Sequence, residues 1–127
     1  MFNILLVGLG GFIGSIARYL ASGYVQQITQ SIDFPYGTLA VNLIGCFVIG
    51  VLAELADARG VFTTESRSFV FVGILGGFTT FSSFSNETMN LMRDGEMLPA
   101  LANVSAHIVL GLGAVWLGRL VAHAVWG

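Results

Sequence analysis

Four long stretches with very few charged side chains dominate this sequence of 127 residues. They lie at about residues 4–23, 37–56, 68–91 and 97–122. Each is long enough for an α-helix to cross the hydrocarbon core of a bilayer, which is about 30 Å thick and takes about 20 residues. A soluble chain of this length has too little interior to hide so many apolar side chains. We therefore expect an all-α integral membrane protein with four transmembrane helices and a single domain, residues 1–127.

Composition narrows the possible functions. Charged residues make up 9% of the chain and the net charge is −2, while soluble domains carry about 25% charged residues. All five cations are isolated arginines, so no basic patch for nucleic acid is expected. Cys46 is the only cysteine, which excludes an intrachain disulfide and a thiolate zinc site. The N-terminus, MFNILLVG, lacks the basic residues of a signal peptide, so we expect a retained span.

The arginines say little about which way the chain inserts. Four spans place both termini on one side of the membrane. Arg59, Arg67 and Arg119 belong to that side, and Arg18 and Arg93 belong to the other. A Lys/Arg excess normally sets the orientation of a membrane protein. Here the excess is so small that two alternatives stay open: insertion in both orientations, or a weak bias that still selects one.

Glycines recur at a spacing of four residues in the first and third spans. The stretch VGLGGFIGS resembles a dinucleotide-binding pattern, but Ile13 stands where the third glycine belongs and no βαβ unit follows. Small residues four apart, such as Gly10 with Gly14 and Gly73 with Gly77, let membrane helices approach closely. We interpret them as helix-packing faces. Because four spans hardly enclose a pathway, we also take these faces as an indication of a dimer.

The third span contains the stretch GILGGFTTFSSFSNET, residues 73–88, which mixes glycines, hydroxyls and phenylalanines. Interior glycine weakens a helix, so we predict a break near Gly76–Thr79. A break at membrane depth is tolerated only where protein or a watery cavity satisfies the freed backbone. The ends of the two half-helices then offer carbonyl oxygens for a cation and N–H groups for an anion.

A helix after the break would line up two stripes of side chains. One contains Thr80, Ser83 and Glu87, and its neighbour contains Phe81 and Phe84. Hydroxyl hydrogens and the electropositive edges of aromatic rings suit a small, strongly hydrated anion. The alternative is a helix interface held by Ser/Thr hydrogen bonds and packed by phenylalanine.

Four further polar side chains lie in or beside the spans, where such groups are functional candidates. Asn42 is either a donor lining a pathway or a partner in an interhelical hydrogen bond. Arg18 either reaches to the interface or places a positive charge at the mouth of a polar cavity. Glu87 is either interfacial or caps the polar stripe. His107 is either a neutral, hydrogen-bonded packing histidine or a ligand or proton relay.

Three motifs resemble one known family. GGFTTFSSFSNE is similar to the third-span signature of the Fluc (CrcB) fluoride channel family, GTLAVNLIG to its second-span signature, and GGFIGSIARY to its first-span pattern with an arginine. The resemblance covers essentially the whole chain. It implies an antiparallel, dual-topology homodimer with two fluoride pathways and a structural Na⁺ at the dimer centre. Motif position assigns the sodium-binding backbone carbonyls to Gly76 and Thr79.

The same resemblance implies a function and a set of site residues. The function is passive, selective fluoride export across the cytoplasmic (inner) membrane, which protects against fluoride toxicity and involves no catalysis. Phe81 and Phe84 match the pore phenylalanines and Asn42 matches the pore-lining asparagine. Ser82 and Ser83 match the family's hydroxyl pair, Arg18 matches the arginine at the aqueous vestibule, and Glu87 matches the acid that closes the third-span motif. The candidate fluoride pathway comprises Asn42, Phe81, Phe84, Ser82, Ser83, Thr80, Arg18, Glu87 and His107.

The fourth span departs from the family pattern. Where several relatives carry a ladder of hydroxyls, this chain has Asn103, Ser105 and His107, followed by Gly111 and Val115. We expect water or third-span hydroxyls to replace the lower part of that track.

Two other classes of function serve as rivals. A four-span, proton-coupled drug antiporter requires a buried acid in the first span, where this chain has Arg18 and no acid. A non-transporting assembly subunit would use the hydroxyls and phenylalanines for packing alone.

Overall fold

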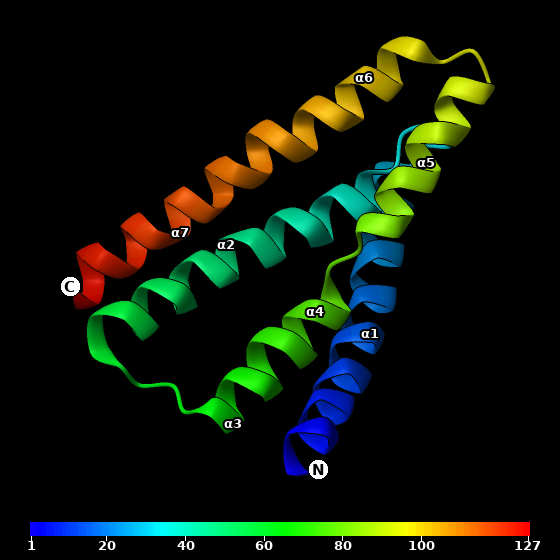
Figure 1. The fold of residues 1–127 in the computed structure, drawn as a ribbon. Coiled ribbons are helices and arrows are strands. Elements are labelled where there is room, and N and C mark those ends of the chain that lie inside the picture. Colours follow the sequence, from blue (N-terminus) through cyan, green and yellow to red (C-terminus); the bar gives the residue numbers. More distant parts are fainter.

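The computed structural model describes all residues, 1–127, and every regular element in it is helical (Figure 1). Four helical runs are long and apolar enough to cross a membrane. Each runs opposite to the one before it, and both termini lie at the same end of the molecule (Figure 1). The predicted all-α, four-span architecture is confirmed, and the four predicted spans fall inside the runs Phe2–Thr29, Tyr36–Arg59, Thr64–Arg93 and Met97–Trp126.

The first two runs are single helices, whereas the third and fourth are composite. The elements in chain order are α1 (Phe2–Thr29), α2 (Tyr36–Arg59), α3 (Thr64–Arg67), the π-helical η1 (Ser68–Leu75), α4 (Gly76–Phe78), α5 (Phe81–Arg93), α6 (Met97–Ser105), the π-helical η2 (Ala106–Leu110) and α7 (Gly111–Trp126). The wide π turn is rare and often marks a functional site. In the fourth run it contains His107.

The first run packs against the third through glycines. A Cβ on Gly10 would lie 2.8 Å from the Cα of Gly73, and a Cβ on Gly14 would overlap the carbonyl oxygen of Ile74. A Cβ on Gly77 would lie 2.9 Å from the carbonyl oxygen of Gly11. These distances are below van der Waals contact, so only glycine fits, and the predicted packing role is confirmed. The glycine faces pack within one chain, however, and therefore give no indication of a dimer.

The second run packs against the fourth in the same manner. A Cβ on Gly50 of α2 would overlap the carbonyl oxygen of Val115 in α7, and a Cβ on Gly118 of α7 would overlap that of Phe47. Near the termini, Arg119 of α7 lies 3.4 Å from a carboxylate oxygen of Glu54 and 3.3 Å from one of Asp57. These contacts close the α2–α7 pair at the end where both termini lie (Figure 1).

Candidate functional site

The third run breaks at Thr79 and Thr80, between α4 and α5 (Figure 1). The backbone is extended at both residues, with φ −94° and ψ 158° at Thr79 and φ −151° and ψ 111° at Thr80. The predicted break is therefore present. The glycine pair Gly76–Gly77 remains helical in α4, and the break falls on the two threonines that follow. β-Branched side chains favour extended backbone, which suits threonine to this position.

Asn42 of α2 holds the broken backbone at two atoms. Its Oδ1 accepts the N–H of Thr80 at 2.8 Å, and its Nδ2 donates to the carbonyl oxygen of Thr80 at 3.1 Å. Nδ2 also lies 3.0 Å from Nε2 of His107 in the fourth run. Since a backbone N–H can only donate, the amide oxygen must face Thr80 N, which fixes the orientation of the amide. Asn42 thus joins the second, third and fourth runs at membrane depth.

The hydroxyl cluster begins with Thr80 as the N-cap of α5. Thr80 Oγ1 accepts the N–H of Ser83 at 3.2 Å and donates to Ser83 Oγ at 3.0 Å. Ser82 Oγ lies 3.4 Å from the same oxygen. The expectation that Thr80 lies inside the helix is wrong, because Asn42 holds its backbone in an extended conformation and α5 starts at Phe81. Thr80 and Ser83 nevertheless meet, as a capping pair.

A row of rings continues from the break into the fourth run. The Phe81 and Phe84 ring centroids are 5.4 Å apart at an interplanar angle of 58°. The Phe84 ring and the His107 imidazole are 4.1 Å apart at 38°. Phe81 is 77% exposed in the single chain. The two predicted phenylalanines therefore share one face, and His107 lies against the inner of the two.

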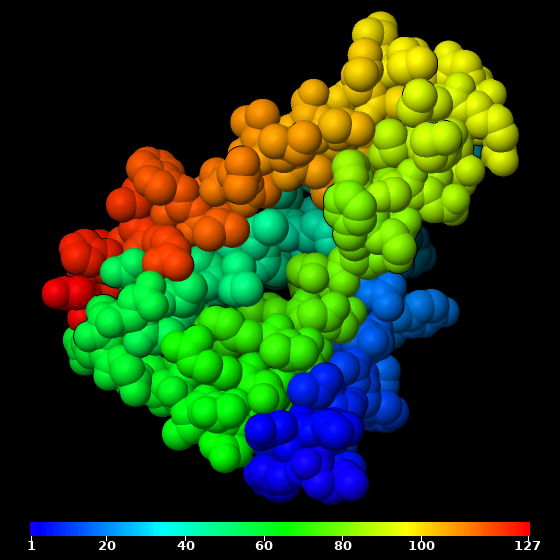
Figure 2. Space-filling model, viewed as in Figure 1, coloured from blue at the N-terminus to red at the C-terminus, as the bar shows by residue number.

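These groups line one groove of about 780 Å³. It lies on the face where α2, the third run and the fourth run come together (Figure 2). Gly111 lines the same groove, and a Cβ there would have only Cys46 Sγ nearby, at 3.7 Å. The groove thus has free space at Gly111, whereas Val115 presents its backbone to Gly50 of α2. Among the predicted site residues, those that line the groove are Asn42, Gly76, Thr79, Thr80, Phe81, Phe84 and His107. Ser82 and Ser83 are not among its lining residues.

Glu87 lies apart from this groove, on a second cavity of about 570 Å³ between the α1–α2 and α5–α6 connections. Its Oε2 accepts a hydrogen bond from Thr38 Oγ1 at 2.9 Å, and its Oε1 is buried without a partner. Gln26 shapes the wall of this cavity. Its Nε2 donates to the carbonyl oxygens of Ser31 and Phe34, and its Oε1 accepts the N–H of Gly37. We did not predict Gln26, because it follows the predicted first span and two of its three partners, Ser31 and Phe34, lie in a connector.

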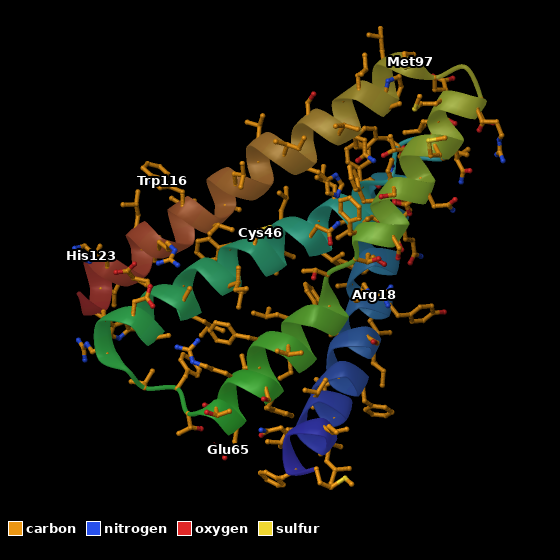
Figure 3. The ribbon with its side chains drawn as sticks, in the orientation of Figure 1. Arg18, Cys46, Glu65, Met97, Trp116 and His123 are labelled. Atoms are coloured by element: carbon orange, nitrogen blue, oxygen red, sulfur yellow. The ribbon has the colours of Figure 1, made fainter.

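Arg18 contacts the break from the side of α1 (Figure 3). Its Nε donates to the carbonyl oxygen of Gly77 at 3.0 Å. Gly77 lies near the C-terminal end of the helix that precedes the break, where a cation is favourable. Arg18 lines neither the groove nor the second cavity. It stabilises a half-helix end, an arrangement that neither of its two sequence interpretations describes.

The carbonyls of Gly76 and Thr79 meet one requirement of a cation site. In a continuous helix they would accept the N–H groups of Thr80 and Ser83. Those N–H groups donate instead to Asn42 Oδ1 and Thr80 Oγ1. Both carbonyl oxygens have therefore lost their regular helix donors, and backbone carbonyls of this kind replace the hydration shell of an alkali cation.

Two further polar residues lie beside the site, Asn103 of the fourth run and Thr88 of α5. Asn103 is fully buried, and its Nδ2 donates to Thr88 Oγ1 at 2.9 Å. The backbone carbonyl oxygen of Asn103 lies 3.0 Å from Nδ1 of His107. Thr88 was not predicted. It lies one residue beyond the motif at 76–87, and its helical spacing from Phe84 was the available signal.

Comparison with known proteins agrees with this architecture. The family model described as "CrcB-like protein, Camphor Resistance (CrcB)" matches residues 5–119. The fluoride-specific ion channel FluC of Methylobacillus flagellatus is 47% identical over 118 residues, which cover 93% of this chain and 92% of the relative. That of Opitutus terrae is 48% identical over 120 residues, covering 93% and 90%.

A third relative, with a lower sequence identity, gives a similar result. Fluoride-specific ion channel FluC 1 of Methanosarcina acetivorans is 40% identical over 122 residues, covering 96% of this chain and 92% of the relative. The names of these relatives describe an ion channel and not an enzyme. The three sequence motifs indicated a resemblance to this family. The family match over residues 5–119 and the identity over nearly the full length show that the chain belongs to the CrcB-like family.

Proposed function

We propose that this protein is a fluoride-selective channel that exports fluoride passively across the cytoplasmic membrane. The observation that carries the proposal is the break at Thr79–Thr80, which Asn42 holds beside a groove lined by Phe81 and Phe84. Relatives that are 40–48% identical bear the name of a fluoride-specific ion channel, which supports the same conclusion. No reacting group is required for passive export.

The groove offers the groups that a dehydrating anion needs. Fluoride gives up bound water only where the pore supplies replacement hydrogen-bond donors. Thr80 lines the groove, and its hydroxyl lies within hydrogen-bonding reach of the Ser82 and Ser83 hydroxyls, which are not among the groove's lining residues. The edges of Phe81 and Phe84 present weakly positive C–H groups on the adjacent face. In this proposal the anion moves between the hydroxyls and the ring edges.

We propose that the working unit is an antiparallel homodimer. The groove is open in a single chain, and Phe81, a large aromatic residue next to polar groups, is 77% exposed. A second copy would cover it and complete the wall of the pathway. The near-equal distribution of arginines between the two ends allows the second copy to insert the other way up.

Topology can be tested with one engineered cysteine. In a Cys46→Ser background, Asp94→Cys places a thiol in the exposed α5–α6 turn. A membrane-impermeant maleimide should label roughly half of the chains from either side if insertion is dual. Labelling from one side alone would contradict the antiparallel arrangement.

We further propose a structural Na⁺ at the dimer centre. The carbonyls of Gly76 and Thr79 would supply two oxygens per chain, and hard cations take more oxygen ligands than two. The antiparallel copy would supply the rest. A cation there would also offset anion charge in a medium of low dielectric constant.

Sodium removal tests the proposed metal site. A cation present at a hundred times its Kd stabilises the folded state by about 2.7 kcal/mol. Exchange of Na⁺ for N-methylglucamine should therefore lower the Tm of the detergent-solubilised protein by several degrees. An unchanged Tm would contradict a site that binds sodium.

Export itself is testable in cells. A bacterial strain without its own fluoride exporter should regain growth in fluoride when it produces this protein, and its internal fluoride should fall. Phe12→Ile, an exposed position on α1, should complement as well as the unmodified chain. Complementation that fails despite normal membrane insertion would contradict the proposed function.

A further inference from the structure

Every hydrogen of the Asn42 amide is occupied. Nδ2 lies 3.1 Å from the carbonyl oxygen of Thr80 and 3.0 Å from Nε2 of His107. A side-chain amide has two N–H groups and no third. An anion that takes a hydrogen bond from Asn42 must therefore displace one of these two acceptors.

Of the two hydrogen bonds that Asn42 Nδ2 donates, the one to His107 is the easier to displace. Thr80 is bound to the amide at both ends, through its N–H at 2.8 Å and its carbonyl oxygen at 3.1 Å. His107 is bound to the amide through one atom only, Nε2. Displacing the imidazole leaves the amide oriented by Thr80, whereas displacing Thr80 releases the broken backbone. An anion entering the groove gains the hydrogen at lower cost by replacing His107.

The geometry also assigns the tautomer of His107. Asn42 Nδ2 can only donate, so Nε2 of the imidazole accepts and carries no hydrogen. Nδ1 then holds the hydrogen and donates it to the backbone carbonyl oxygen of Asn103 at 3.0 Å. In this state neither ring nitrogen has a hydrogen left for an ion. His107 therefore acts on the pathway through Asn42 and not as a donor of its own.

We propose that His107 is a positioning residue that competes with fluoride for one N–H of Asn42. This inference rests on the proposed function. Without an ion, the imidazole satisfies a polar hydrogen that is costly to leave unpaired away from water. With an ion present, the imidazole gives up that hydrogen. The competition weakens fluoride binding at Asn42, and conduction requires that an ion bind weakly enough to leave.

Two substitutions separate this role from packing. His107→Phe keeps a flat ring beside Phe84, whose ring is 4.1 Å away, and removes the acceptor. His107→Gln loses the ring and keeps an acceptor. The measurement is a fluoride titration of the Asn42 side-chain ¹⁵N–¹H signals in the detergent-solubilised full chain.

The two roles predict opposite results. Competition predicts that the fluoride concentration at half-saturation falls about threefold or more in His107→Phe, because an unpaired N–H gains a partner on ion binding. In His107→Gln that concentration should stay near the wild-type value. A pure packing role predicts a larger change in His107→Gln than in His107→Phe. Equal half-saturation in wild type and His107→Phe would also overturn the competition.

A second readout needs no fluoride. Ring ¹⁵N signals should identify His107 as the Nδ1–H tautomer, and Asn42→Ala should shift it toward Nε2–H, with the exposed His123 as an internal reference. Fluoride transport together with an Nε2–H tautomer in the wild type would overturn this inference alone. An Nδ1–H tautomer in a chain that transports no fluoride would overturn the proposed function, and the competition with it.

Discussion

Two of the contacts that hold the third run in place are built in opposite ways. Its first half packs on α1 through glycines, with backbone against backbone and no side chain between them. Its break is held to α2 by the amide of Asn42, which replaces helix hydrogen bonds with side-chain ones. The glycine contact tolerates no added atom, whereas the Asn42 contact tolerates no lost donor or acceptor. The first makes a rigid support, and the second keeps polar backbone at membrane depth.

The difference teaches where function can reside in so small a bundle. Glycine packing brings two helices together and leaves no group for a ligand. The break leaves hydroxyls, ring edges and carbonyls facing a groove, while Asn42 and Arg18 satisfy part of the freed backbone. A rigid contact one turn away lets such a break persist. Each substitution below acts on one side of this comparison.

The largest effect is expected at the glycine contact. Gly14→Leu would drive a side chain into the backbone at Ile74. Overpacking typically lowers the free energy of unfolding by about 1–3 kcal/mol, and occasionally by more. We expect little folded protein by size-exclusion chromatography and thermal unfolding in detergent. Gly8→Leu is the matched control, because nothing lies within 4 Å of a Cβ there. Equal stability of the two variants would contradict the close packing of α1 on the third run.

Asn42→Ala should have the next largest effect. It leaves the N–H and carbonyl of Thr80 without their partners, and an unsatisfied buried group costs about 1–3 kcal/mol. We expect a stability loss of about 2–3 kcal/mol and a fluoride flux too low to distinguish from empty liposomes. Asn86→Ala is the control, because Asn86 is an exposed asparagine on α5 that makes no side-chain hydrogen bond. Wild-type flux in Asn42→Ala would show that the break needs no amide.

Phe81→Ile tests the ring edges without disturbing the fold. Phe81 is exposed in the single chain, so its replacement leaves the chain's own packing almost intact. Aromatic electrostatic contacts contribute about 0.5–1.5 kcal/mol, which corresponds to a fall in flux of up to about tenfold. Phe12→Ile on α1 should leave flux unchanged. Equal flux in both variants would remove the ring-edge argument, and loss of the dimer in Phe81→Ile would show a structural role instead.

The smallest effect is expected at the second cavity. Thr38→Val keeps the shape of the side chain and removes the hydrogen bond to Glu87 Oε2. We expect a loss of about 1 kcal/mol in the free energy of unfolding, typical of one hydrogen bond. Thr64→Val, at an exposed position without a side-chain hydrogen bond, is the control. A loss as large as that of Asn42→Ala would mean that this cavity, and not the break, holds the bundle together.

The parts of the fold that depend on local pattern could be predicted from the sequence. Span length and charge depletion predict the four helical runs, and four-residue spacing predicts the glycine faces at Gly10, Gly14 and Gly73. Glycine also predicts the break, though only to within a turn. The exact place depends on Asn42, which binds Thr80 from 38 positions away along the chain.

Much of the site could not be predicted in this way, because its partners are distant in sequence. Asn42 and His107 are 65 positions apart, and Arg18 and Gly77 are 59 apart. Periodicity places each residue on a face but does not pair the faces of different helices. The motifs resembling the family named Asn42, Phe81 and Phe84 together, and the structure brings these three to one groove. Arg18, Ser82, Ser83 and Glu87, named with them, lie outside that groove.

The most direct test of the central claim is ion efflux from liposomes that contain the purified protein. A fluoride electrode records release, and chloride is measured in parallel under the same gradient. We expect rapid loss of fluoride and negligible loss of chloride, with the fluoride signal abolished by Asn42→Ala. Retention of both ions by liposomes with correctly folded protein would contradict a fluoride channel built on this break.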